Sequence, residues 1–298
     1  MRWRLSRWSR LSKRFEGRAA EFYGGAYFGE GRDGGGTERR GRSGYPTYDR
    51  VSSNADISAY VVWRNFASAR RSLDVGCAKG FLVEALSELG MDALGCDSSQ
   101  FAVDHAPSSM RGRIRRADPR DGLPYGDDDF DVVTVLETLE HLPPESVPAA
   151  LGEIRRVCRG FVYATIPSFG PSGGPGPDGF FEGKVRPERQ LEYEARGPGY
   201  QGPVAFADLA RDAEGDPVEG HLTIASYSWW TARFAEAGFS RRTEIEARIH
   251  EDIAPAGLAT FWNLYVFSVP GSDEELARQR EPGQTLVQLG LHHPLFGS

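Results

Sequence analysis

Two histidines stand where a side chain could take a proton from a bound ligand. His141 lies five residues after an apolar run, and His221 lies at the end of a long Gly/Pro-rich stretch. Imidazole titrates near neutrality, so a neutral histidine can accept the proton of a hydroxyl group at physiological pH. We predict His141 as the first candidate for a general base and His221 as the second. The alternatives are a histidine that packs against or caps the following helix, and a histidine in a surface loop.

A glycine-containing turn is the second chemical signal. The run reads Leu73-Asp74-Val75-Gly76-Cys77-Ala78-Lys79-Gly80-Phe81-Leu82. Glycines let the backbone approach a ligand, and the first turn of a following helix offers free N–H groups to an anionic group. A dinucleotide-binding turn has the spacing G-x-G-x-x-G. Here Cys77 takes the place of the middle glycine, which argues against a nucleotide-dependent oxidoreductase.

These residues must be positioned by strands that alternate with helices. Such alternation predicts a mostly parallel sheet with helices on both faces, and ligands bind such sheets at the carboxyl ends of the strands. The predicted strands cover residues 73–75, 93–96, 113–116, 131–136 and 161–166, and the predicted helices cover 53–69, 81–89, 99–105 and 146–158.

An insertion at residues 168–220 interrupts this pattern with many glycines, prolines and charges. A segment this long in a compact domain is typical of a functional loop, a lid or disorder. Its composition predicts no core of its own, yet it carries Phe169, Phe180, Phe181, Tyr193, Tyr200 and Phe206. We therefore expect it to be loose alone and to order over an acceptor. A helix over 226–237, ended by Gly238, and two strands over 243–249 and 260–269 are expected to complete a seven-stranded sheet.

The glycine turn resembles motif I of class I S-adenosylmethionine-dependent methyltransferases, in particular those of type 11/12. The usual form of that motif is apolar-Asp-x-Gly-x-x-x-Gly-x-apolar. Three further signals follow in the order of the family: Asp97 after the second strand, Asp118 after the third, and Glu137 after the fourth. The resemblance implies a Rossmann-like α/β fold with S-adenosylmethionine as the cofactor. It also implies cofactor contacts, without a metal ion, from Asp74, Gly76, Cys77, Ala78, Gly80, Asp97, Ser98, Asp118 and Glu137.

The resemblance assigns two of these acids particular contacts. It places the Asp97 carboxylate on both ribose hydroxyls, since two acceptor oxygens suit two donors. It places Asp118 on the adenine amino group. The chain departs from the family at Pro119, because the residue after the acid often donates its N–H to adenine and proline has none. We therefore expect the adenine contacts to be less well defined than the ribose contacts.

Net charge and cysteine number limit the possible binding partners of the protein and the cellular compartment in which it works. The net charge of −7 argues against a nucleic-acid surface, and three scattered cysteines indicate a reducing compartment, the cytoplasm. Residues 1–18 carry a charge of +6 and could form a basic amphipathic helix with weak contact to a membrane surface, or a solvated leader. We divide the chain into a leader and cap segment (1–70), a methyltransferase domain (71–270) that contains the insertion on its acceptor side, and a C-terminal tail (271–298).

The resemblance implies transfer of a methyl group, and the acceptor is an expectation by analogy. We expect O-methylation of a small molecule or a sugar hydroxyl, in bacterial secondary metabolism or glycan biosynthesis. N- or C-methylation is the alternative within the class, and a catalytically silent binding module is the alternative outside it. Replacement of residues 172–200 by a short linker is expected to spare cofactor binding and to abolish methyl transfer.

Overall fold

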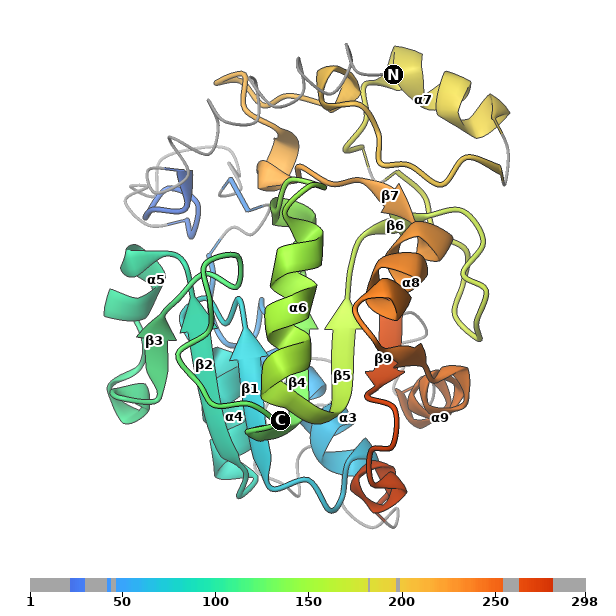
Figure 1. The fold of residues 1–298 in the computed structure, drawn as a ribbon. Helices are drawn as coiled ribbons and strands as arrows, with labels where there is room; N and C mark the ends of the chain where they lie inside the picture. The colour runs from blue at the N-terminus through green and yellow to red at the C-terminus, as the bar shows by residue number, and fades with distance from the viewer. Residues whose placement is uncertain are drawn as a thin grey trace.

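The structure, a computed structural model, describes residues 22–29, 42–43, 47–181, 183–196, 199–253 and 263–280. At its centre lies a seven-stranded sheet with the order β3-β2-β1-β4-β5-β9-β8 (Figure 1). The first five strands are parallel and β9 is antiparallel to both of its neighbours. The strands are β1 (Arg71–Val75), β2 (Asp92–Asp97), β3 (Ile114–Arg116), β4 (Phe130–Leu136), β5 (Cys158–Thr165), β8 (Ser240–Arg241) and β9 (Leu264–Ser268).

Helices cover both faces of this sheet (Figure 1). One face packs against α3 (Ala55–Asn65), α4 (Phe81–Glu88) and α9 (Thr243–Ile253), and the other against α6 (Val147–Val157) and α8 (Tyr227–Glu236). The short helix α5 (Gln100–Asp104) lies beside β2 and β3. Neighbouring residues such as Val132 and Val133 belong to opposite cores, which explains the continuous apolar runs of the central strands. No described helix is long and apolar enough to span a membrane.

The predicted mostly parallel α/β fold is confirmed, and one predicted strand is wrong. Residues 243–249 form the first part of helix α9, and the two-residue strand β8 precedes them. The alternation of apolar residues at 245, 247 and 249 suits a strand, whereas the four-residue spacing of Ile245, Ile249 and Ile253 suits a helix. All three isoleucines are buried against the sheet in α9, so packing of the helical stripe decides the structure. Within the predicted strand 260–269, residues 260–262 lie outside the described residues.

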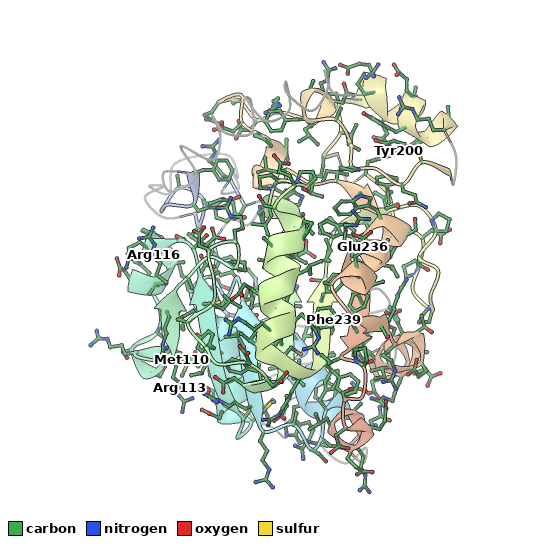
Figure 2. All side chains as sticks on the ribbon, viewed as in Figure 1. Met110, Arg113, Arg116, Tyr200, Glu236 and Phe239 are labelled. Carbon is green, nitrogen blue, oxygen red and sulfur yellow. The ribbon has the colours of Figure 1, made fainter. Side chains whose placement is uncertain are left out.

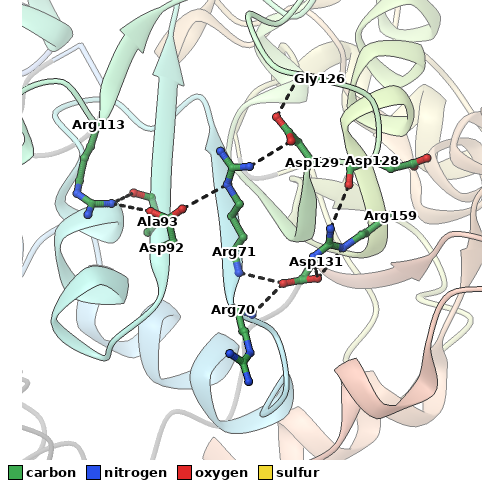
Figure 3. Close-up of polar contacts among 10 residues, drawn as sticks. All are labelled: Arg70, Arg71, Asp92, Ala93, Arg113, Gly126, Asp128, Asp129, Asp131 and Arg159. Carbon is green, nitrogen blue, oxygen red and sulfur yellow. Dashed lines mark hydrogen bonds and ion pairs between the residues drawn. The ribbon is translucent and has the colours of Figure 1, made fainter.

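The amino ends of the strands are tied together by ion pairs (Figure 3). Asp131 accepts hydrogen bonds from the backbone N–H groups of Arg70 and Arg71, at 2.9 and 3.0 Å, and pairs with Arg159. Together with these hydrogen bonds, the Arg159 guanidinium holds the pKa of Asp131 below its usual range against the opposing effect of burial. This network braces the edge of the sheet opposite the pocket described below.

Three consecutive carboxylates before β4 pair with three different arginines. Asp127 pairs with Arg156, Asp128 with Arg155, and Asp129 with Arg71. Each carboxylate faces a different arginine, as expected for neighbouring residues in a turn.

The insertion lies above the carboxyl ends of the strands (Figure 1). A two-stranded parallel sheet, β6 (Ser168–Phe169) and β7 (Ala225–Ser226), closes its base, and α7 (Pro187–Ala195) lies within it. The insertion holds a buried apolar cluster, which we call the cap cluster: Phe22, Phe169, Phe181, Val185, Tyr193, Val204, Phe206, Leu209, Leu222 and Ile224. The sequence predicted no core of the insertion's own, and the aromatic residues spaced along it indeed share this cluster with Phe22, Leu222 and Ile224 from outside residues 168–220. Tyr200 packs against this cluster (Figure 2), whereas Phe180 is exposed.

Gly80 at the start of α4 offers a test of the packing. Its φ is +82°, and a Cβ atom there would collide with Cδ1 of Ile114 on β3. Gly90 has a similar φ of +87°, and a Cβ atom there would meet no other atom within 4 Å. Gly80→Ala is therefore expected to lower the free energy of unfolding by about 1–3 kcal/mol more than Gly90→Ala, as measured by urea denaturation. Adding Ile114→Val should restore part of this difference, and equal losses for the two alanine variants would contradict the packing argument.

Candidate functional site

A pocket of about 580 Å³ opens at the carboxyl ends of β1, β2 and β4. The predicted site residues Asp74, Gly76, Cys77, Ala78, Asp97, Ser98, Asp118, Glu137, His141 and His221 line it, and Gly80 does not. Arg116, at the end of β3 (Figure 2), also lines the pocket. The structure therefore brings together residues that are distant in the sequence. Gly80 instead gives β3 room to pack against the start of α4.

The turn after β1 has a backbone that few residues adopt. Gly76 and Ala78 have φ values of +80° and +48°. The N–H groups of Gly76 and Cys77 both donate to the carbonyl of Cys96 on β2, at 2.8 and 3.0 Å. A Cβ atom on Gly76 would collide with the side chain of Thr138. Gly76 is thus required for two reasons. Its φ is positive, and the segment after β4 packs directly on the turn.

Asp97 connects the two loops of the pocket. Its Oδ2 accepts from the N–H of Ala78 at 2.8 Å, and its Oδ1 accepts from the N–H of Ser99 at 2.7 Å. Each carboxylate oxygen has a second acceptor position, so the group can also receive two ribose hydroxyls. Burial raises the pKa of Asp97, while the two backbone hydrogen bonds oppose this change.

The buried side chains of Asp74 and Cys77 pack beneath the turn, on its side toward the protein core. Asp74 is buried and accepts from Oγ1 of Thr134 at 2.7 Å. Burial raises its pKa to about 7. The Cys77 thiol is also buried, which raises its pKa, and it lies against the position that a Cβ of Gly95 would occupy. Both side chains thus contribute to the shape of the turn.

The two remaining acids differ in their partners. Asp118 receives the N–H of Arg120 at 2.9 Å and is paired with its guanidinium, whose Nη2 lies 2.7 Å from Oδ2. This pairing occupies acceptor positions that the family resemblance assigned to the adenine amino group. Glu137 is exposed to the pocket and has a φ of +49°, and strained backbone of this kind often accompanies functional sites.

The two predicted histidines meet at the other end of the pocket. Their ring centroids lie 5.0 Å apart, and Nε2 of each ring is 3.9 Å from Oε1 of Glu140. Burial lowers the pKa of His141 to about 4 and that of His221 well below its usual value, so both imidazoles are neutral at physiological pH. Nδ1 of His141 lies 3.3 Å from the carbonyl oxygen of Gly220, which leaves Nε2 as the nitrogen available for chemistry.

Two further residues, Tyr23 and Glu140, complete the site, and the sequence analysis assigned a role to neither. The Tyr23 hydroxyl lies 3.2 Å from Nδ1 of His141, and the carbonyl of Tyr23 accepts from Oγ of Ser99 at 2.7 Å. Tyr23 therefore connects the loop after β2 with His141. Glu140 is fully buried. Its place beside a histidine was visible in the sequence, but Tyr23 lies in a segment without a periodic pattern, and no signal marked it.

The sheet order and the pocket at the carboxyl ends of the parallel strands are those of a Rossmann-like α/β domain that binds a ligand at this edge. Residues 73–162 match the family model described as a methyltransferase domain. This range extends from the start of the glycine turn into β5 and includes each acid predicted to contact the cofactor. The residues of the pocket fit S-adenosylmethionine, since Asp97 can accept two ribose hydroxyls beside the glycine turn.

Curated relatives of the domain are O-methyltransferases by name. The chain is 42% identical over 105 residues to the ubiquinone biosynthesis O-methyltransferase of Methylococcus capsulatus, covering 33% of this chain and 44% of that protein. The enzyme of the same name from Nitrosococcus oceani is 36% identical over 120 residues, covering 35% of this chain and 47% of that protein. The chain thus spans less than half the length of the curated relatives it matches.

Solved structures resemble the chain over a larger share of its length. CalS10, an amino pentose methyltransferase from Micromonospora echinaspora, is 19% identical with a TM-score of 0.48, covering 74% of this chain and 92% of that chain. DesVI of Streptomyces venezuelae is 17% identical with a TM-score of 0.46, covering 74% and 91%.

Proposed function

We propose that the chain transfers the methyl group of S-adenosylmethionine to a hydroxyl oxygen of a small ring compound, with a sugar hydroxyl as the first choice. The observation that carries this proposal is the meeting of His141 and His221 in the same pocket as Asp97. Two neutral imidazoles at the end of a cofactor pocket suit an acceptor that must lose a proton. The names of the curated relatives support oxygen as the methylated atom.

The residues of the chain act mainly by positioning. The cofactor supplies a methyl group on a sulfonium, which is already electrophilic, so alignment of the acceptor oxygen contributes much of the rate. Asp97 and the glycine turn hold the ribose end. His141, oriented by the Gly220 carbonyl and the Tyr23 hydroxyl, activates the acceptor hydroxyl for proton loss, with His221 behind it. Tyr27, Phe28 and Tyr48 also line the pocket, and their rings offer faces for a sugar or another ring compound.

We further propose that residues 168–220 and the described N-terminal residues form the acceptor side. Glu219 lines the pocket from the end of this segment, and His221 and Leu222 line it directly after the segment. Arg42 pairs with Asp212 and Asp216 at 2.5 and 2.7 Å. Among the described residues, none between 172 and 200 lines the pocket. We therefore propose that residues 172–200 hold His221 in place without lining the pocket themselves.

We place the reaction in the cytoplasm, which the three free, buried thiols support. The proposed membrane contact concerns residues 1–18, which lie outside the described residues.

The proposed function is tested by mass spectrometry of bacterial small-molecule extracts incubated with the chain and an isotopically labelled methyl donor. We expect a labelled product whose methyl group is an ether. A labelled amine or a carbon-methylated product would move the activity to the N- or C-methyl class. Binding of S-adenosylhomocysteine without any labelled product in broad extracts would favour a silent binding module.

Replacement of residues 172–200 by a short Gly/Ser linker is expected to abolish methyl transfer and to change cofactor affinity little. The replacement removes Phe181, Val185 and Tyr193 from the cap cluster, together with Lys184, which pairs with Glu219 beside His221. Calorimetry with S-adenosylhomocysteine and a labelled-methyl assay would measure the two effects separately. Retained methyl transfer would show that the segment is dispensable, and lost cofactor binding would place it on the cofactor side.

A further inference from the structure

We propose that Glu140, His141 and His221 form a binding site for one divalent transition-metal ion, zinc in the first place, at the acceptor end of the pocket. The metal site itself is independent of the acceptor, whereas its role in catalysis rests on the proposed function. The donor atoms of these three side chains all lie within 4.8 Å of one another. Two imidazoles and a carboxylate are ligands that zinc and its first-row neighbours prefer.

The distances between donor atoms suit a shared ion. Nε2 of His141 and Nε2 of His221 are each 3.9 Å from Oε1 of Glu140. Bonds of about 2.1 Å in a tetrahedral site place neighbouring donors about 3.4 Å apart. For these two pairs a contraction of about half an ångström gives that spacing, and the third pair of donor atoms lies within 4.8 Å before any side-chain rotation.

The backbone holds the two ligand-bearing segments in place. The carbonyl of Glu140 accepts from the N–H groups of Leu222 and Thr223, at 2.7 and 2.9 Å, and Oγ1 of Thr223 donates to the carbonyl of Leu142 at 2.6 Å. These three hydrogen bonds fix the turn that carries Glu140 and His141 against the extended segment that follows His221. The site is thus formed before any ligand binds.

The surroundings of the ligands also suit a metal ion. Ligating histidines usually donate their second ring N–H to a carbonyl or carboxylate, and the Gly220 carbonyl lies 3.3 Å from Nδ1 of His141. Nδ1 of His221 is buried and makes no such bond within the described residues. Glu219 Oε2 lies 3.8 Å from Nε2 of His221 and is paired with Lys184, so the positive charge of Lys184 is compensated next to the site.

A cation in this position would act on the acceptor. Three protein ligands leave at least one coordination position toward the pocket, which the acceptor hydroxyl would occupy. A divalent cation lowers the pKa of a bound hydroxyl group. The hydroxyl proton then leaves to water, the oxygen forms the new C–O bond, and the S–CH3 bond breaks with its electron pair remaining on sulfur. The two histidines would in this way activate the acceptor through the ion.

Metal binding can be measured without any acceptor. The purified full chain is treated with EDTA, desalted and titrated with Co²⁺, followed by calorimetry and by the visible absorption of the bound ion. We expect one Co²⁺ per chain with an intense visible band typical of four or five ligands, and displacement of Co²⁺ by Zn²⁺. His221→Ala and Glu140→Gln should each weaken Co²⁺ binding at least about tenfold, since each removes one of three ligands.

The matched control is His250→Ala on α9, since His250 does not line the pocket. This variant should bind Co²⁺ as the wild type does, and thermal melting checks that each variant is folded. Absence of Co²⁺ binding by the wild type, or equal binding by wild type and both ligand variants, would overturn the inference. Full methyl transfer by the metal-free chain would overturn the role of the ion in catalysis, while the proposed function would stand. Metal binding without a labelled product in any extract would leave the metal site and remove the proposed function.

Discussion

His141→Ala is expected to lower the turnover of methyl transfer by about 10²–10⁴-fold, the usual effect of removing a group that assists proton loss. Nε2 of His141 is the nitrogen on the side of His221 and Glu140, while Nδ1 is held by Tyr23 and Gly220. Cofactor affinity should stay within about threefold of the wild type, because the hydrogen bonds of the His141 side chain go to Tyr23 and Gly220 and not to Asp97 or the glycine turn. A labelled-methyl assay gives the turnover, and calorimetry with S-adenosylhomocysteine gives the affinity.

The matched control for this variant is His105→Ala, an exposed histidine whose ring stacks on Phe101. It should retain its turnover. Tyr23→Phe provides a graded comparison, because it removes the hydroxyl next to Nδ1 and keeps the ring between Phe22 and Tyr27. Turnover of His141→Ala within two- to threefold of the wild type would show that the acceptor is activated elsewhere, with His221 next to be examined.

Asp97→Ala is expected to weaken the binding of S-adenosylmethionine by about 1–3 kcal/mol, or roughly 5- to 150-fold. The substitution removes the carboxylate that we propose as the acceptor for both ribose hydroxyls. It also leaves the N–H groups of Ala78 and Ser99 without their carboxylate partner, so the two loops of the pocket lose a connection. Calorimetry with S-adenosylhomocysteine measures the loss directly.

Two variants distinguish these contributions. Asp97→Asn keeps one carbonyl acceptor and removes the charge, so its affinity should fall between those of the wild type and the alanine variant. Asp104→Ala, on the exposed side of α5, removes a carboxylate that accepts from Gln100 and should leave the affinity unchanged. If Asp97→Ala binds the cofactor like the wild type, the ribose lies elsewhere in the pocket.

The sequence by itself determined the central sheet and the cofactor end of the site. The signals there are local: an apolar strand, a glycine turn and a helix follow one another within ten residues, Asp74 stands one residue before the end of β1, and Asp97 ends β2. Because parallel strands bring their carboxyl ends to the same edge, the convergence of Asp97 and the glycine turn follows from strand order alone. The matching family model covers the same stretch.

Local patterns failed where two structures satisfy them equally. Residues 243–249 alternate like a strand, and only the core beneath Ile245, Ile249 and Ile253 selects the helix. The sequence likewise could not show why residue 80 is a glycine. The side chain that a Cβ atom there would meet belongs to Ile114, which lies 34 residues further along the chain.

Tertiary structure alone decided the acceptor end. His141 and His221 are separated by 80 residues of sequence, and they meet because Leu222 and Thr223 donate to the carbonyl of Glu140. The cap cluster forms because single aromatic residues, each without a periodic neighbour, find one another and Phe22 in space. Burial of such scattered side chains depends on the closure of long loops, whose free energy is not encoded in any short segment. For this reason the cofactor was predictable from residues 73–137, whereas the pairing of the histidines required the fold.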